Sequence, residues 1–377
     1  MKKTRFGRHL ALLLVLLLVM AACADDEGST TTAGGGGDTT TTVASAGCTA
    51  EQIDGDLNFY NWSEYIDPEL ITEFESTYNT DVVETFYESN EAMLAQIQAG
   101  VVYDLIVPSD YMISIMTTDG LLYPLDKDAI PNLANLDPQF VNPPYDPTSE
   151  FSVPYQWGTT GLAVDLAVLG EDFEESWGLI FNPDMNAGMP VSMLNDARET
   201  IGAALKYLGY SLNSTSEAEV QEAADLISAA RESIIKFDSD QYTDDLVNGE
   251  VAISHGYNGN FFLTFDEIDG WDDYYYFMPQ EGGTVWVDNM AIPTDAEHPC
   301  TAQTFINFIL DAEKGAQLTN WNFYASPNTA AKEFIDPEIL EDTAIFPDDA
   351  TMERLEFIEN TGAFELNFQN LFTEAKS

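Results

Sequence analysis

Two aromatic–carboxylate groups are the side chains best suited to hold an organic cation. Asn61-Trp62-Ser63-Glu64-Tyr65 follows an apolar run at 57–60, and Trp286-Val287-Asp288 lies far along the chain. A carboxylate attracts an ammonium group, and aromatic faces add a cation–π attraction of about 0.5–2 kcal/mol. Alternation along a strand places Trp286 and Asp288 on the same face. We therefore expect one cation-binding box, assembled from both ends of the chain.

The elements that must position these groups alternate between strands and helices, which predicts an α/β fold. Asp67-Pro68 supplies an N-cap and a first-turn proline for one helix, and Asn90 is predicted to cap the next. Ligands of α/β proteins generally bind beyond the carboxyl ends of strands. Both 62–65 and 109–111 are expected at such ends. Apolar runs predict strands at 57–62, 81–86, 104–107 and 251–254.

A second lobe is expected beyond residue 158, after a stretch at 125–154 that is rich in Pro, Asn and Asp. Within it, a capping box of Ser216 and Glu219 predicts a long helix over 217–236. Four apolar residues would form the buried stripe of this helix, namely Val220, Ala223, Ile227 and Ile234. The chain is expected to return to the first lobe near Asp288.

Residues 1–22 have the pattern of a lipoprotein signal peptide. A basic start precedes an apolar run at 10–19, which is too short to cross a bilayer, and small residues then precede Cys23. We expect Cys23 to carry a lipid that anchors the chain outside the cytoplasm, with simple secretion as the alternative. The Thr- and Gly-rich segment 23–52 is predicted to be a flexible tether. Cys48 and Cys300 remain, either as a disulfide in an oxidising compartment or as two free thiols.

The formal net charge of −52 comes from 65 acidic and 13 basic residues. Nucleic acid and anionic membrane surfaces are therefore poor partners, and we expect membrane contact through the lipid anchor alone. Small cations would be attracted electrostatically. Most of these acids must nevertheless form an ordinary solvated surface. The sequence shows no phosphate-binding loop of the P-loop type and no Cys/His spacing typical of a metal site, so no metal or cofactor is expected.

The order and spacing of several short motifs resemble those of the polyamine-binding receptors of ABC importers, the spermidine/putrescine family. The motifs are FYNWSEY at 59–65, YESNE at 87–91, YDLIVPS at 103–109, NDARE at 195–199, KYLGY at 206–210, EGG at 281–283 with WVD at 286–288, and SPN at 326–328. The resemblance implies a two-lobed type II periplasmic-binding-protein fold with the ligand cleft between the lobes. It places lobe 1 at 53–158 and 288–332 and lobe 2 at 159–287 and 333–377.

The same resemblance implies a set of ligand-binding residues drawn from both lobes. They are Trp62, Ser63, Glu64, Tyr65, Ser109, Tyr111, Asp196, Glu199, Tyr257, Trp286, Asp288 and Tyr324. Asp196 and Ser109 are also placed to cap helices, and the aromatic residues are also candidates for the core. Glu64 and Asp288 are the strongest candidates, because neither solvation nor capping explains an acid enclosed between aromatics.

Two details bear on the ligand. Near the C-terminus, the spermidine receptors of the family offer a glutamine, and Glu359 is the candidate replacement in this chain. The stretch at 258–260 lacks the acid expected of a putrescine-restricted receptor, which favours spermidine. The resemblance thus implies a monomeric extracytoplasmic receptor that hands spermidine, or next putrescine, to an ABC transporter permease without bond chemistry.

Three alternatives remain open at this point. The same fold can serve another cationic amine or a guanidinium solute. Paired carboxylates also occur in secreted glycosidases. A calcium-dependent surface protein is disfavoured, because Asp238-Ser239-Asp240 does not continue as a calcium loop.

Overall fold

The computed structural model describes residues 47–377. The predicted signal peptide, the predicted lipidation site at Cys23 and most of the predicted tether lie outside the described residues. Among residues 47–377, no helix combines the length and apolarity that a membrane span requires.

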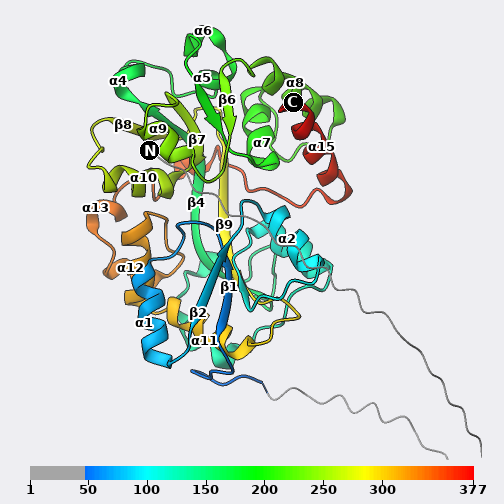
Figure 1. The fold of residues 1–377 in the computed structure, drawn as a ribbon, viewed down its shortest axis with the longest axis vertical. Coiled ribbons are helices and arrows are strands. Elements are labelled where there is room, and N and C mark those ends of the chain that lie inside the picture. The colour runs from blue at the N-terminus through cyan, green and yellow to red at the C-terminus, as the bar shows by residue number, and fades with distance from the viewer. Residues whose placement is uncertain (1–46) are drawn as a thin grey trace, which may run out of the picture. The chain divides into compact units, whose positions relative to one another are not determined.

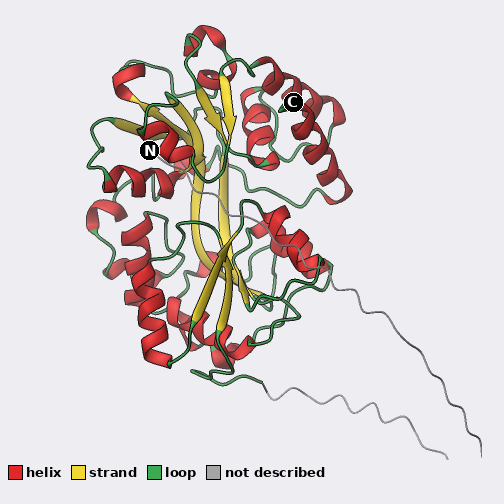
Figure 2. Cartoon of the chain, viewed as in Figure 1, coloured by secondary structure: helices red, strands yellow, loops and turns green. Residues whose placement is uncertain are grey.

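A single mixed sheet runs through both lobes of the described chain (Figure 1, Figure 2). Its strand order is β2-β1-β3-β9-β4-β7-β5-β6, and β8 also pairs with β4. Pairing is parallel within β2-β1-β3 and within β7-β5-β6, whereas β4 and β9 are antiparallel to their neighbours. The strands are β1 (Leu57–Asn61), β2 (Val82–Phe86), β3 (Leu105–Ile106), β4 (Ser152–Asp165), β5 (Val191–Met193), β6 (Ile234–Phe237), β7 (Ile253–Tyr257), β8 (Tyr274–Phe277) and β9 (Thr284–Ala291).

Strands β4 and β9 run side by side from one lobe to the other (Figure 1). They pair from Ser152↔Ala291 to Thr160↔Thr284, so one ribbon passes from lobe 1 into lobe 2. The register shifts between Pro154 and Gln156, beside a proline that has no N–H to donate. Trp286 and Asp288 lie on this ribbon.

Lobe 1 is built on an aromatic core. The ring of Phe305 lies 5.4 Å from that of Phe59 and 4.9 Å from that of Phe74. Asp67 caps the first helix through Glu69 N, as predicted, but the second helix is capped by Ser89 and not by Asn90. The helices of this part of the chain are α1 (Pro68–Tyr78), α2 (Asn90–Gln98), α3 (Asp110–Thr118), α11 (Pro299–Ile309) and α12 (Ala312–Asn322), with short 3-10 turns η1 (Lys127–Ala129), η2 (Pro131–Asn135), η3 (Pro138–Phe140) and η4 (Thr329–Glu333). Helices α2 and α3 pack in a separate cluster that contains Met93 and Met112.

Lobe 2 packs helices against β5, β6 and β7. Ile201, Ile227 and Phe372 are buried in one cluster that joins its three longest helices. The remaining helices of the described chain are α4 (Leu166–Leu169), α5 (Gly178–Phe181), α6 (Pro183–Asn186), α7 (Ala197–Tyr207), α8 (Glu217–Ala229), α9 (Tyr242–Val247), α10 (Asn258–Glu267), α13 (Pro337–Leu340), α14 (Asp349–Met352) and α15 (Glu365–Ala375), with η5 (Gly362–Phe364) before the last. Of these, α13 packs against Ala316 and Ala331 of α12 and η4.

The predicted helix over 217–236 is wrong in its second half. Ser216 caps α8 as expected, but the helix ends at Ala229 and the chain turns into β6 at Ile234. Ile234 is buried, as the helical stripe required, yet it pairs in parallel with Val191 at the edge of the sheet. Its spacing from Ile227 fits a helix, whereas two successive β-branched residues at 234–235 favour a strand.

A disulfide joins Cys48 to Cys300, with Cα atoms 5.3 Å apart across a sequence separation of 252 residues. Cys300 lies in the first turn of α11. The bond therefore fastens the start of the described chain to the core of lobe 1.

Candidate ligand-binding site

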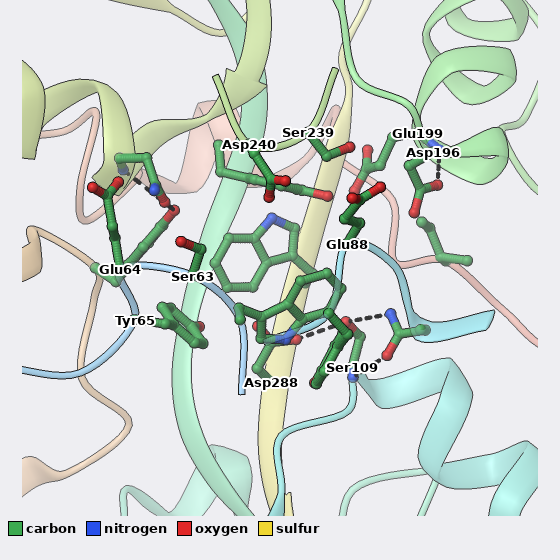
Figure 3. A pocket seen from close by; sticks show the side chains of 18 of the residues that line it. Ser63, Glu64, Tyr65, Glu88, Ser109, Asp196, Glu199, Ser239, Asp240 and Asp288 are labelled. Carbon is green, nitrogen blue, oxygen red and sulfur yellow. Dashed lines mark hydrogen bonds between the residues drawn. The ribbon is translucent and has the colours of Figure 1, made fainter. Parts of the chain in front are cut away.

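One cavity lies between the lobes beside the β4–β9 ribbon, and it encloses about 790 Å³ of space, including its open mouth (Figure 3). All of the residues predicted from the sequence to bind ligand line this cavity. They are Trp62, Ser63, Glu64, Tyr65, Ser109, Tyr111, Asp196, Glu199, Tyr257, Trp286, Asp288 and Tyr324. Their contact with a ligand stays a prediction, because the structure contains no ligand.

Asp288 is the buried acid on the ribbon. The Ser109 hydroxyl donates a hydrogen bond of 2.6 Å to Asp288 Oδ1, and the Asn90 amide donates to the same hydroxyl at 3.0 Å. Burial raises the pKa of the Asp288 carboxyl to about 7, against the opposing effect of the Ser109 hydrogen bond. Ser109 occupies the N-cap position of α3, but its side chain makes no capping bond. Its hydroxyl instead orients Asp288 (Figure 3).

Asp110 is a second buried acid in the cavity wall, and it was not among the residues predicted to bind ligand. Its carboxylate accepts from the backbone N–H of Tyr111 at 2.6 Å and of Val287 at 3.3 Å. It thereby ties the start of α3 to β9, one residue from Asp288. Burial raises the pKa of Asp110 to about 8. A first-turn helical acid is common, so its type and position alone gave no signal.

Asp196 and Glu199 supply two buried acids from lobe 2. Asp196 Oδ1 caps α7 by accepting from Arg198 N at 2.9 Å and from Glu199 N at 3.0 Å. Thr160 donates to Glu199 Oε1 at 3.0 Å, while Glu199 Oε2 has no hydrogen-bond partner within residues 47–377. Burial, and next the neighbouring Asp196 charge, raise the pKa of Glu199 to about 8. Asp196 therefore both caps α7 and lines the cavity.

Arg198, which separates these two acids in the sequence, does not line the cavity. Its guanidinium is buried and donates to Glu365 at 2.7 Å, to Asn213 at 2.9 Å and to the backbone oxygen of Glu359 at 3.0 Å. No Lys, Arg or His is among the residues that line the cavity in the described chain. The wall thus carries carboxylates without a cationic side chain among them.

Aromatic rings surround Trp286. Tyr324 lies 5.3 Å from it, Tyr257 5.9 Å and Tyr65 6.5 Å, all between ring centroids and in edge-to-face arrangements. The Trp286 indole N–H donates to Thr160 at 3.2 Å. Trp286 and Tyr324 are also buried members of the lobe 1 core. The rings are therefore fixed by packing and still face the cavity.

The expectation that Glu64 is enclosed between aromatics is wrong. Ser63 and Glu64 are exposed, and Glu64 adopts a left-handed backbone conformation with φ 53°. Partial burial raises the pKa of Glu64, and the acids Glu267 and Asp244 of lobe 2 raise it further. Figure 3 shows Glu64 on the side of the cavity opposite to Asp196 and Glu199. Glu64 thus belongs to the mouth of the cavity.

Glu359 does not line the cavity, so the candidate replacement for the family glutamine is not at the wall. Its neighbour Ile358 is there instead, only 6 % exposed, and it packs with Tyr87 and Tyr111 of lobe 1. The backbone of Glu359 is held by Asn213 and Arg198 of lobe 2. The segment therefore presents an apolar side chain where a polar one was expected.

The remaining lining residues were also not selected from the sequence. They are Tyr87, Glu88, Asn90, Asp110, Ser239, Asp240, Tyr242, Asn260 and Ile358. Tyr87, Glu88 and Asn90 lie within a motif that carried the family resemblance, which was an available signal. Ser239 and Asp240 follow the strand β6. Because that segment was predicted to be helical, the rule that ligands bind beyond strand ends did not indicate them, and their sequence suggested only a calcium loop.

Comparison with known proteins agrees with this architecture. The family model described as bacterial extracellular solute-binding protein matches residues 69–347. The spermidine/putrescine-binding periplasmic protein of Escherichia coli (strain K12) is 32% identical over 335 residues, which cover 88% of this chain and 95% of that protein. The putrescine/cadaverine-binding protein of Pseudomonas aeruginosa is 32% identical over 341 residues, covering 88% and 96%.

A solved structure agrees as well. The putative spermidine/putrescine ABC transporter from Listeria monocytogenes superposes with a TM-score of 0.80 at 33% identity, covering 85% of this chain and 99% of that one. The chain therefore belongs to the bacterial extracellular solute-binding protein family, with the two-lobed type II fold of periplasmic binding proteins. The Escherichia coli and Pseudomonas aeruginosa relatives are both named as binding proteins.

Proposed function

We propose that this protein is an extracytoplasmic receptor that binds a polyamine between its lobes and delivers it to the permease of an ABC transporter. The observation that carries the proposal is a cavity walled by acids and aromatic rings, with no cationic side chain among the lining residues of the described chain. The lining acids are Glu64, Glu88, Asp110, Asp196, Glu199, Asp240 and Asp288.

The chemical groups of a polyamine are complementary to the side chains of the cavity wall. Its ammonium groups suit the carboxylates, and its methylene chain suits the faces of Tyr257, Trp286 and Tyr324. Each charge-assisted hydrogen bond contributes about 1.5–3 kcal/mol. Micromolar binding requires about 8 kcal/mol, so a few such contacts are enough after ordering and desolvation.

We propose spermidine as the preferred ligand and putrescine as the next. Asn260, where an acid would favour a short diamine, accepts a hydrogen bond from the Tyr324 hydroxyl and adds no charge. The names of the relatives support the polyamine class, since all three include putrescine and two include spermidine.

The remaining parts of the proposal concern how the receptor is organised. Lobe 1 comprises 53–158 and 288–332, and lobe 2 comprises 159–287 and 333–377. The separate clusters around Phe305 and around Ile227 support this division. The mature chain acts as a monomer, held at the membrane by lipid on Cys23.

Titration calorimetry on the chain without its signal peptide, carrying Cys23→Ser and stripped of bound ligand by refolding, tests the function. Spermidine, putrescine, spermine, agmatine and arginine are titrated in turn. The expected result is one site per chain with micromolar or tighter affinity for spermidine. Tighter binding of agmatine or arginine would move the function to a guanidinium solute, and no heat with any ligand would reject the proposal.

A further inference from the structure

A contact between the lobes extends beyond the cavity. One buried apolar cluster of lobe 1 is built on β3, α2 and α3, with Ile106, Met93 and Met112 among its members. Among the described residues, its only buried members from lobe 2 are Leu212, which is fully buried, and Ile358. We call these two side chains the clasp. The clasp therefore buries apolar surface of lobe 2 in a core of lobe 1.

Leu212 belongs to lobe 2 and lies outside the ligand-binding site. It follows α7 and precedes α8 in the chain, and a methyl group added to Gly202 of α7 would come within 3.4 Å of its Cβ. Unlike Ile358, Leu212 does not line the cavity. The cavity wall therefore does not account for the burial of Leu212, whereas the lobe 1 cluster does.

The segment that carries Ile358 is fixed to lobe 2. Its backbone bridges at Glu356 to Thr284 of β9, and Asn213 Nδ2 donates to Phe357 O at 2.8 Å. Figure 1 shows the chain that leads to α15 running along the junction of the lobes. The backbone of this segment is thus part of lobe 2, while the side chain of Ile358 is buried in the lobe 1 cluster.

Arg198 adds a cation–π contact between the same two lobes. Its guanidinium carbon lies 5.9 Å from the centroid of the Tyr111 ring, within the range of that interaction. The Tyr111 hydroxyl donates to Glu91 of α2 at 3.1 Å, which ties the ring to lobe 1. The cation–π contact and the clasp therefore act in the same sense, because separation of the lobes removes both.

We propose that the clasp holds the two lobes together independently of the contacts that a ligand makes, and thereby lengthens the time for which a ligand stays bound. The part that concerns binding rests on the proposed polyamine-binding function, whereas the part that concerns closure does not. Separation of the lobes exposes the clasp to water, and burial of one aliphatic side chain is favourable enough to change a rate constant by about tenfold or more. A ligand enters and leaves while the lobes are apart, so the clasp should slow dissociation and leave association unchanged.

The test compares Leu212→Ala with Leu205→Ala as a matched control. Both substitutions remove the same atoms from a fully buried leucine, but Leu205 lies on α7 in the core of lobe 2 and outside the lobe 1 cluster. Stopped-flow fluorescence with spermidine and with putrescine gives the association and dissociation rates. Small-angle X-ray scattering of the ligand-free proteins gives their radii of gyration. Thermal unfolding establishes that each variant is folded, and Leu212→Val with Leu205→Val replaces the pair if either alanine variant does not fold.

Leu212→Ala should raise the dissociation rate of both ligands by the same factor, about tenfold, with the association rates unchanged. The ligand-free variant should also have a larger radius of gyration than the wild type, whereas Leu205→Ala should match the wild type in both measurements. Unchanged dissociation rates, an equal change in Leu205→Ala, or a change for one ligand alone would overturn the inference. Equal radii in all three proteins would overturn it as well.

The two readouts separate this inference from the proposed function. A wild type that binds no polyamine would reject the proposed function, and the scattering comparison would still decide whether the clasp holds the lobes together. Polyamine binding with the same kinetics in Leu212→Ala and the wild type would reject the clasp and leave the proposed function intact.

Discussion

The acids at the floor of the cavity differ from those at its mouth in their surroundings. The floor acids, Asp110, Asp196, Glu199 and Asp288, are buried and accept hydrogen bonds from the protein. The mouth acids, Glu64, Glu88 and Asp240, are exposed and face acids of the opposite lobe. Burial makes the charged form of a floor acid costly until a cation arrives. The floor is therefore suited to affinity, and the mouth to electrostatic attraction of the ligand.

The largest effect is expected from Asp288→Asn, which removes the charge of a floor acid and keeps its size. A buried ammonium left without its carboxylate costs about 3–5 kcal/mol, so calorimetry should show spermidine affinity falling at least about 100-fold. Glu88→Gln is the comparison at the mouth and should cost far less. Equal losses for the two variants would remove the distinction between floor and mouth.

The pH dependence of binding should come from the floor. The pKa values of about 7 for Asp288 and about 8 for Asp110 and Glu199 mean that these carboxyls are largely protonated at pH 6. A bound cation favours the ionised form, so affinity should rise about tenfold from pH 6 to pH 8.5, with protons released on binding. Calorimetry in buffers of different ionisation enthalpy measures that release. Binding without proton release would show that the floor acids are already charged.

Two serines at N-cap positions offer a matched pair with a smaller expected effect. Ser109→Ala removes the hydrogen bond to Asp288, which raises the pKa of that carboxyl further and should weaken spermidine binding by about five- to tenfold at pH 7. Ser89→Ala removes a genuine helix cap, since Ser89 accepts from Ala92 N at 3.2 Å. It should lower the unfolding temperature without changing affinity. If instead Ser109→Ala lowered the unfolding temperature and Ser89→Ala weakened binding, Ser109 would be the residue with the structural role.

The smallest effect is expected at Glu64, the exposed acid at one end of the mouth. Glu64→Gln should reduce the association rate by about two- to threefold at low salt, and the difference should shrink at high salt. Stopped-flow fluorescence of the surrounding tryptophans measures the rate, with Glu69→Gln as an exposed control on the adjacent helix. A loss as large as that of Asp288→Asn would place Glu64 among the ligand-binding acids of the floor.

Local patterns were sufficient to predict the alternation of strands and helices and the meeting of strand ends at the cavity, whereas the rest of the predicted site residues came from the family resemblance. Strand ends carry Trp62 and Ser109, and the alternation of β9 places Trp286 and Asp288 on one face. Both signals depend only on local pattern and on the rule that strand ends meet at one edge. They are therefore readable before any tertiary contact is known.

The rest depended on contacts that local patterns do not encode. The spacing of Ile234 from Ile227 was consistent with a helix, but the segment that begins at Ile234 pairs as a strand with the edge of β5. Glu64 lies between two aromatic residues in sequence, yet its backbone is left-handed and the residue is exposed. Asp110 resembles an ordinary first-turn acid until Val287 is seen to donate to it. For Ile234 and Asp110, a partner distant in sequence decides the outcome.

The β4–β9 ribbon has a mechanical consequence. Because backbone hydrogen bonds join its two strands across the junction of the lobes, the strands cannot slide past one another without breaking their register. Any change in the angle between the lobes must then be a bend or twist of the ribbon itself. Trp286 and Asp288 lie on this ribbon, so a ligand bound to them also contacts the segment that bends. Ligand binding and the angle between the lobes thus depend on the same structural element, the β4–β9 ribbon.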